Sequence, residues 1–233
     1  MFGIFTGVLA NVATVVAGPA VGLIFKTEKL KRIGERIFQV FALYVMVMGV
    51  EGALGVSQPL LLLASIIIGV AAGELLDLDK GFSRLGEKLQ ARFTKGSDSR
   101  FSEGFMQASL LFCIGSMTIL GALQSGLENQ QSIYLTKSVL DLVSSMTLAM
   151  GFGIGVGFSA LTVLVFQGLL VLGASALAPI LTDSTVAVCV QVGSLSLIGI
   201  SLNMLGLTKL KVANILPAMF VPMIWQAITL LMR

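Results

Sequence analysis

The dominant feature of the sequence is a series of apolar runs separated by short polar segments. Most runs approach the length of about 20 residues that a helix needs to cross a bilayer, so they predict membrane spans. The composition agrees, because 56% of the residues are hydrophobic and 12% are charged, against about 25% charged in a typical soluble domain. We therefore expect an all-α, polytopic bundle of transmembrane helices that forms one integral membrane domain over residues 1–233.

The apolar runs predict about eight spans. They are expected at 3–25, 37–55, 58–76, 105–124, 139–157, 159–181, 185–206 and 212–231. The fifth and sixth runs form one apolar stretch that is too long for a single crossing. Glycines recur between residues 151 and 157, and they favour a break of the helix there.

The lysines and arginines predict the orientation of the chain. All of them except Lys137 and Arg233 fall in three groups, at 26–36, 80–100 and 209–211. Cytoplasmic loops carry an excess of these residues, and with eight spans the three groups share one side. We therefore expect all three groups to be cytoplasmic and both termini to be external.

The longest polar segment, 77–104, has a helical pattern of its own. Its large apolar residues recur at helical spacing, and four basic residues recur every four positions: Lys80, Arg84, Lys88 and Arg92. This pattern predicts an amphipathic helix in the cytoplasmic interface whose basic residues contact anionic lipid headgroups. A solvated helix packed on the bundle explains the same pattern equally well.

A weak internal similarity relates the two ends of the chain. The second span opens near Gln39 and the seventh near Gln191, and each follows a span with a proline after a small residue, Pro19 and Pro179. Spans one to three (1–76) would then match spans six to eight (159–233) in opposite topology, as in many secondary transporters. Apolar sequences match one another easily, so a chance similarity is the alternative.

Asp141 is the acidic residue that stands out within the predicted spans. Lys137 precedes it by one helical turn, and Ser144 and Ser145 follow it by one turn. Acidic residues in a span are costly and usually functional, and a carboxylate beside hydroxyls can bind Na⁺ or carry H⁺. The alternative is a structural ion pair near the outer surface.

Three asparagines within or near the spans extend this hypothesis. Asn11, Asn203 and Asn214 are expected to meet Asp141, Ser144 and Ser145 near the middle of the bilayer, where they would bind a substrate or ion. The alternative for each amide is a hydrogen bond between helices, which is common in membrane bundles.

The absence of histidine narrows the chemistry. The sequence contains no His and two cysteines, Cys113 and Cys189, which both fall inside apolar runs. Imidazole ligation of metals and histidine-based catalysis are excluded, and we expect no enzyme activity, no cofactor and no metal site. The net charge of +3 comes from residues beside apolar runs, so we expect lipid rather than nucleic acid as the partner.

Several segments carry a family resemblance. Residues 107–123, 137–141 and 206–217, together with Gly73–Asp77 and Asn11, resemble the YqgA-like family of bacterial inner-membrane proteins, a domain of unknown function. The resemblance extends over nearly the whole chain. It implies a location in the bacterial inner membrane and supplies no activity.

Two functions remain open at this point. The first is a small secondary transporter, or a carrier of an ion or metabolite that the sequence does not identify. The second is a scaffold or regulatory membrane protein that acts through the amphipathic helix. The sequence leaves open whether the chain forms a homo-oligomer.

Overall fold

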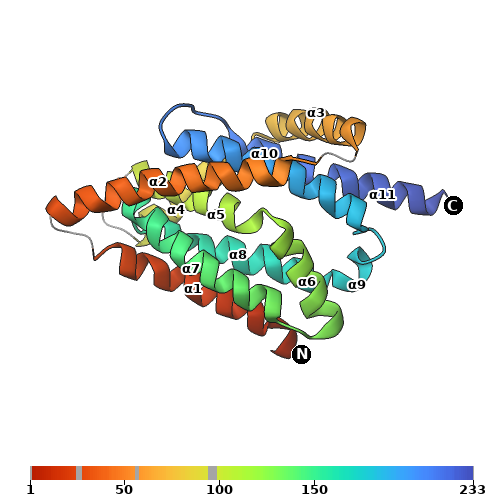
Figure 1. Cartoon of the computed structure of the whole chain (residues 1–233), viewed down its shortest axis with the longest axis horizontal. Helices are drawn as coiled ribbons and strands as arrows, with labels where there is room; N and C mark the ends of the chain where they lie inside the picture. The colour runs from red at the N-terminus through yellow and green to blue at the C-terminus, as the bar shows by residue number, and fades with distance from the viewer. Residues whose placement is uncertain (1, 25–27, 56–57, 94–98, 233) are drawn as a thin grey trace.

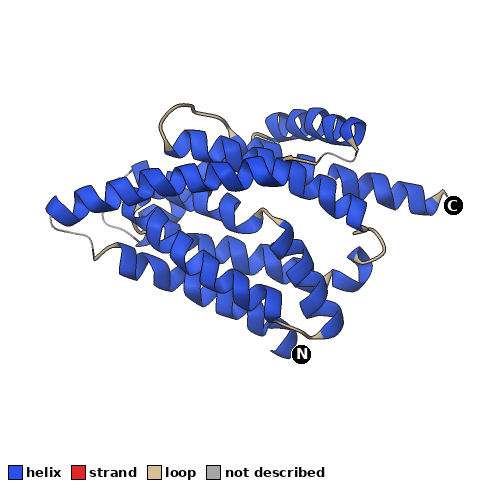
Figure 2. Ribbon diagram, in the orientation of Figure 1, coloured by secondary structure: helices blue, strands red, loops and turns tan. Residues whose placement is uncertain are grey.

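The computed structural model describes residues 2–24, 28–55, 58–93 and 99–232, which form helices joined by short loops and contain no strand (Figure 2). Short 3₁₀ segments precede the first and last helices. The elements in chain order are η1 (Phe2–Phe5), α1 (Thr6–Gly22), α2 (Glu28–Ala53), α3 (Pro59–Leu76), α4 (Leu78–Phe93), α5 (Ser99–Cys113), α6 (Ser116–Glu128), α7 (Ser132–Phe152), α8 (Gly155–Leu172), α9 (Ala174–Leu177), α10 (Asp183–Met204), η2 (Val212–Met219) and α11 (Val221–Leu231).

Six segments of the described chain are long and apolar enough to cross a membrane, which confirms the prediction of a transmembrane α-helical bundle. They are Gly3–Gly22, Arg32–Ala53, Pro59–Leu76, Gly155–Leu172, Asp183–Met204 and Val212–Leu231. The bent pair α5–α6 raises the number to seven if it is one span. Helix α7 has 21 residues, a sufficient length, but its lysine, aspartate and hydroxyl side chains make it more polar than these segments.

The helices run mostly along the long axis of the molecule (Figure 1). Helix α1 packs against α7 and α8, α2 packs against α10, and α3 packs against η2. Small residues allow the closest approaches, because a Cβ atom at Gly18 would collide with Ser145 on α7 and one at Gly69 would collide with Ala218. Small residues at helix contacts are typical of membrane proteins, since they bring backbones together.

Two glycines interrupt the helices. Gly153 has a φ of 79° and separates α7 from α8, so the predicted break in the glycine-rich stretch is confirmed. Gly115 has a φ of 127° and separates α5 from α6, which meet at a bend of 60°. The prediction of one unbroken helix over 105–124 is therefore wrong, because Gly115 adopts a backbone conformation that is open mainly to glycine.

The basic groups gather at one end of the molecule. The rings of Phe38 in α2 and Phe152 at the end of α7 lie 5.1 Å apart. Lys211, in the loop before η2, lies 3.4 Å from Glu74 at the end of α3, and α4 follows directly. The N- and C-termini lie toward the opposite end (Figure 1). The first basic group lies largely on the opening turns of α2, which begins at Glu28, rather than in a loop.

Helix α4 packs on the bundle with its basic side chains outward. Phe82, Gly86 and Gln90 are buried or half-buried, and Gly86 contacts Ser102 of α5. The four basic residues singled out in the sequence are all exposed: Lys80, Arg84, Lys88 and Arg92. Within the polar segment 77–104, α4 ends at Phe93 and α5 begins at Ser99.

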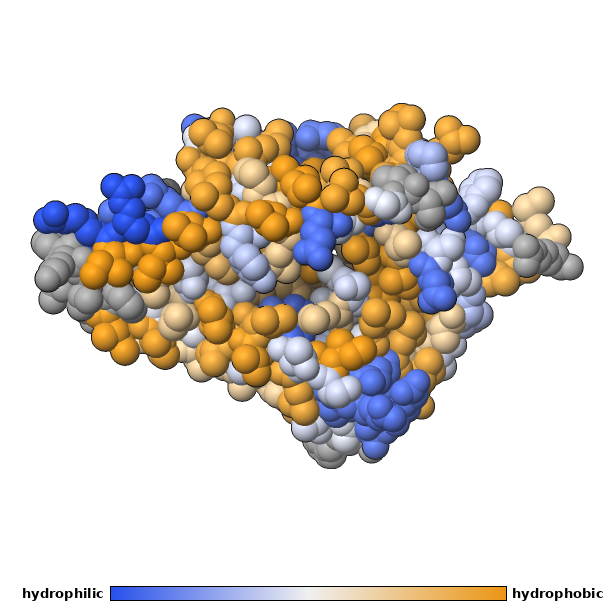
Figure 3. All heavy atoms as spheres, viewed as in Figure 1, coloured by the Kyte–Doolittle hydropathy of each residue, from blue (hydrophilic) through white to orange (hydrophobic). Residues whose placement is uncertain are grey.

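The surface of the molecule is largely apolar (Figure 3). Large exposed side chains include Val40 on α2, Leu60 on α3 and Leu169 on α8. A water-soluble monomer rarely exposes a contiguous apolar patch of more than a few hundred square ångströms. This surface therefore fits the bilayer as its solvent.

Candidate functional site

The centre of the candidate site is a buried ion pair within α7. The Nζ atom of Lys137 lies 2.6 Å from Oδ2 of Asp141. Only 7% of the lysine side chain and 9% of the aspartate side chain are exposed. Taking two charges out of water costs on the order of several kcal/mol per ion. Their mutual attraction must then offset this cost. A pair in this position therefore calls for an explanation other than stability.

The pair lies in the middle of its helix. Asp141 is the tenth of the 21 residues of α7, so it lies about 14 Å along a helix about 31 Å long. The packing of α7 against α1, where Gly18 meets Ser145, helps to cover this part of the helix. The pair therefore lies midway along α7 and is covered by neighbouring helices.

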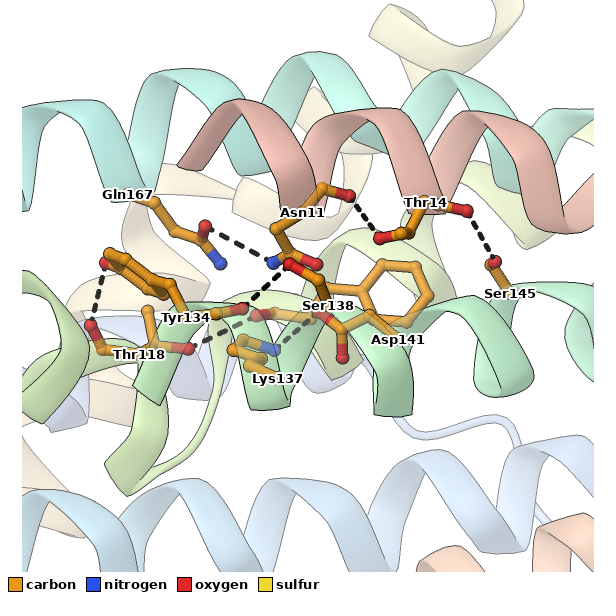
Figure 4. A network of polar contacts seen from close by, with 10 residues as sticks. Asn11, Thr14, Thr118, Tyr134, Lys137, Ser138, Asp141, Ser145 and Gln167 are labelled. Atoms are coloured by element: carbon orange, nitrogen blue, oxygen red, sulfur yellow. Dashed lines mark hydrogen bonds and ion pairs between the residues drawn. The ribbon is translucent and has the colours of Figure 1, made fainter. Parts of the chain in front are cut away.

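Amides from two neighbouring helices lie beside the pair (Figure 4). Asn11 of α1 donates a hydrogen bond of 3.3 Å from Nδ2 to Oε1 of Gln167 on α8. The Asn11 side chain also faces the carboxylate of Asp141. Both amide side chains are fully buried, yet Oδ1 of Asn11 and Nε2 of Gln167 have no partner among the described residues. The site thus has one buried acceptor and one buried donor that could hydrogen-bond to a bound molecule.

Hydroxyl groups complete the polar cluster. Ser138 donates 2.7 Å to the carbonyl of Tyr134, whose own hydroxyl donates 3.0 Å to the carbonyl of Thr118 on α6. Ser145 donates 3.0 Å to the carbonyl of Leu142 within α7 and lies 3.5 Å from the carbonyl of Thr14 on α1 (Figure 4). These bonds tie α1, α6 and α7 together around the ion pair.

A cavity of about 460 Å³ adjoins the ion pair. Lys137, Asp141 and Ser144 contribute its polar lining from α7. The remaining walls come from the break between α5 and α6, residues 114–118, and from apolar side chains of α2, α7 and α10. The molecular surface is hollowed between α2 and α7 (Figure 3). A volume of this size is in the usual range of small-molecule sites, about 300–1,000 Å³.

The break in the α5–α6 pair adds helix ends to the cavity. The first turn of α6 has no side-chain cap, and its opening residues Ser116 and Met117 line the cavity. Thr118 donates 3.3 Å to the carbonyl of Phe112 at the end of α5. Discontinuous helices of this kind hold ions and substrates in many transporters, because their ends present free backbone groups.

The structure brings together four of the six residues predicted to bind a substrate or ion. Asp141, Ser144 and Ser145 lie on α7: Asn11 of α1 faces Asp141, Ser145 contacts Thr14 of α1, and Ser144 lines the cavity beside Asp141. The chemical role of these four residues stays a prediction.

The other two amides lie elsewhere. Asn203 accepts 2.9 Å from the backbone N–H of Leu210 and donates 2.8 Å to its carbonyl. Asn214 accepts 2.8 Å from the backbone N–H of Asp79 at the start of α4. Both residues brace the basic end of the molecule, because loops there leave backbone groups that need partners. The expectation that they join Asp141 is therefore wrong.

Sequence reasoning missed Gln167 and the role of Gly115. Gln167 is the one amide side chain of α8, and a lone amide in an apolar span is a signal that could have identified it. Gly115 resembles the many glycines of the other spans. Its positive φ depends on the packing around it, so composition alone gave no signal.

The candidate site offers no metal centre. Among the described residues, no group of three or more His, Cys, Asp or Glu side chains could hold a metal ion. Cys113 and Cys189 are buried and free. The chemistry on hand is that of one carboxylate, one ammonium group, amides and hydroxyls.

Comparison with known proteins places the chain in a family without an assigned activity. It is 29% identical to "Uncharacterized membrane protein YdfK" of Bacillus subtilis (strain 168), over 93% of each chain. It is 27% identical to "Uncharacterized protein YqgA" of Escherichia coli (strain K12), over 93% of this chain and 94% of the relative. No solved structure matches the chain. The family model described as "Protein of unknown function (DUF554)" matches residues 6–227, so the chain belongs to the DUF554 family of uncharacterised membrane proteins.

Proposed function

We propose that this protein is a small secondary transporter, or ion carrier, of the bacterial inner membrane. The observation that carries the proposal is the buried Lys137–Asp141 pair, 2.6 Å apart, beside a cavity and a broken helix. Ionisable residues within spans are costly and commonly mark ion pathways. The partner is a small ion or metabolite, with no cofactor and no enzymatic step.

The proposal includes eight crossings. Helix α7 is the eighth, because it is long enough to cross and packs between other spans. With α5–α6 as one broken crossing, an even number of spans leaves both termini on one side, and the two ends of the chain lie toward the same end of the molecule (Figure 1). The concentration of basic residues at the opposite end supports a cytoplasmic location for that end.

The packing also supports the inverted repeat. The repeat would pair span one with six, two with seven and three with eight. In the structure α1 contacts α8, α2 contacts α10, and α3 contacts η2. In transporters built from inverted repeats, the interface between the two copies commonly holds the substrate. We propose that residues 1–76 and 159–233 are the two copies.

One observation favours a second candidate function, that of a scaffold or regulator. Lys80, Arg84, Lys88 and Arg92 form an exposed basic row on α4. A row of this kind at the cytoplasmic interface would bind anionic headgroups, with about 1 kcal/mol per basic residue near the surface. This function requires no cavity and no buried ion pair, and it therefore leaves the Lys137–Asp141 pair unexplained.

The test is cation-dependent stabilisation of the purified protein. We expect Na⁺, or a change of pH from 6 to 8, to shift the melting temperature of the wild type, because ligands that bind the folded state stabilise it. The double variant Lys137→Gln/Asp141→Asn removes both charges and keeps the size of Asp141. It should lose the response, and Lys211→Gln, at an exposed ion pair, should retain it. A double variant with the full wild-type response would rule out a carrier role for this pair.

A further inference from the structure

We propose that the site loads a monovalent cation and an apolar monocarboxylate together, because Lys137 exchanges Asp141 for the carboxylate of the second ligand. This inference rests on the proposed carrier function and adds the class of the second ligand. It follows from the charges of the buried cluster, the shape of the cavity and the unpartnered amide atoms.

The charge balance of the site carries the argument. The cluster contains one ammonium group and one carboxylate, which neutralise each other at 2.6 Å. A cation that replaces the ammonium group at Oδ2 of Asp141 leaves Lys137 as a buried charge with no partner. Uncompensated buried charges are strongly unfavourable, so a cation alone binds weakly. An anion that accepts Lys137 removes this penalty and makes the binding of the two ligands cooperative.

The surroundings of Asp141 fit a cation with one charge. Asn11 faces the carboxylate, and its Oδ1 atom is fully buried with no partner among the described residues. Oxygen atoms of carboxylates and amides are suitable ligands for hard cations. Since the site provides one carboxylate, a monovalent cation balances it, and a proton on Asp141 would have the same effect on the charge.

The cavity fits a carboxylate with an apolar body. Lys137 and Asp141 line the same cavity of about 460 Å³, so the ammonium group can turn from one carboxylate to another within it. Phe41, Met48 and Leu197 form part of the opposite walls, and these side chains bury apolar carbon rather than hydroxyl groups. One lysine matches one carboxylate, which favours a monocarboxylate over a dicarboxylate.

Neighbouring groups would hold the displaced lysine and the anion. The ring of Phe112 lies 6.0 Å from Nζ of Lys137, at the outer limit of a cation–π contact. The opening residues of α6, Ser116 and Met117, line the cavity, and the start of a helix favours negative charge. The structure therefore offers a place for each charge after the exchange.

The experiment measures the coupling between sodium and butyrate. The apparent affinity of the purified protein for Na⁺ is determined by thermal stability, with and without saturating butyrate, and with choline chloride holding the ionic strength constant. We expect butyrate to raise the Na⁺ affinity about ten-fold or more, and Na⁺ to raise the butyrate affinity by the same factor, since coupling is reciprocal. Uncharged 1-butanol should leave the Na⁺ affinity unchanged.

Two single variants separate the two halves of the exchange. Lys137→Gln should bind Na⁺ with the same affinity in the presence and absence of butyrate, because no lysine needs a new partner. Asp141→Asn should bind butyrate without Na⁺, because its lysine is already free. Lys211→Gln is the matched control at an exposed pair and should retain full coupling. The double variant Lys137→Gln/Asp141→Asn has no unpaired charge, so it should fold and respond to neither ligand.

The outcomes distinguish the inference from the function on which it rests. If the wild type binds Na⁺ equally well with and without butyrate, the carrier function stands and the exchange is wrong. If Lys137→Gln retains the coupling, or the folded double variant does, the exchange is also wrong. If the wild type responds to neither Na⁺ nor pH, both proposals fall.

Discussion

Two lysine–carboxylate pairs in this molecule differ mainly in their surroundings. Lys137 and Asp141 are 2.6 Å apart with under a tenth of each side chain exposed, whereas Lys211 and Glu74 are 3.4 Å apart with about half exposed. An exposed pair contributes about 0–1 kcal/mol. Breaking a buried pair costs about 3–5 kcal/mol, although an apolar replacement of both partners is often neutral. We therefore expect that the fold can do without the buried pair as a whole, and we attribute the pair to function rather than to stability.

The largest expected effect is the loss of protein stability when one partner of the buried pair is replaced. Lys137→Met and Asp141→Leu should each lower the free energy of unfolding by about 3–5 kcal/mol, because each leaves one buried charge alone. The double variant should recover most of this loss. Chemical denaturation in detergent measures all three variants. Single substitutions that cost no more than those at an exposed pair would erase the contrast between the two pairs.

The second prediction concerns the packing that buries the pair. A Cβ atom at Gly18 would collide with Ser145 and with the backbone of α7, so Gly18→Ala should destabilise the protein by about 1–3 kcal/mol. Gly81 on α4 has open space around it, and Gly81→Ala should stabilise by up to about 1 kcal/mol through helix propensity. Thermal unfolding of both variants compares the tight packing beside the buried pair with the open surface of α4. Equal effects would show that α1 and α7 are not in close contact.

The exposed pair should respond to salt and little else. Lys211→Gln should change the free energy of unfolding by about 1 kcal/mol or less, and the difference from the wild type should shrink as salt screens the charges. Chemical denaturation at low and high ionic strength measures this difference in the free energy of unfolding. A larger cost that salt leaves unchanged would show that Lys211 is as important to the fold as Lys137.

The smallest effect is the pH dependence due to Asp79 on α4. Burial raises the pKa of its carboxyl above the ordinary value of 3.8, so the folded protein holds this proton more tightly than the unfolded chain. The contribution of Asp79 to stability is therefore greatest below pH 3.8 and is lost as the pH rises through the higher folded pKa. Asp79→Asn should lose less stability than the wild type over this range. A steeper loss in the variant would contradict the raised pKa.

Most of the fold could be predicted from the sequence, because apolar runs long enough to cross a bilayer rarely form anything other than membrane helices. The break at Gly153 was predictable from a cluster of glycines, whereas the break at Gly115 was not, because a single glycine in an apolar run also fits an unbroken helix. Asp141 was identifiable because a carboxylate in a span is costly.

The hydrogen-bond partners of the amide side chains were harder to predict from the sequence. Asn11, Asn203 and Asn214 look alike in the sequence, but Asn11 faces Asp141, Asn203 bonds the backbone of a loop, and Asn214 bonds the first turn of α4. An amide both donates and accepts hydrogen bonds, so its partners depend on which helices meet. The tertiary arrangement decides this, and a local pattern does not specify it.

The most direct test of the central claim is ion-driven flux in proteoliposomes. The wild type, Lys211→Gln and the double variant Lys137→Met/Asp141→Leu are reconstituted at equal density, and uptake of labelled butyrate is followed under an inward Na⁺ or H⁺ gradient. The account predicts gradient-dependent uptake by the wild type and by Lys211→Gln, and none by the folded double variant. Equal uptake by all three proteins would contradict the claim that the buried pair is the carrier site.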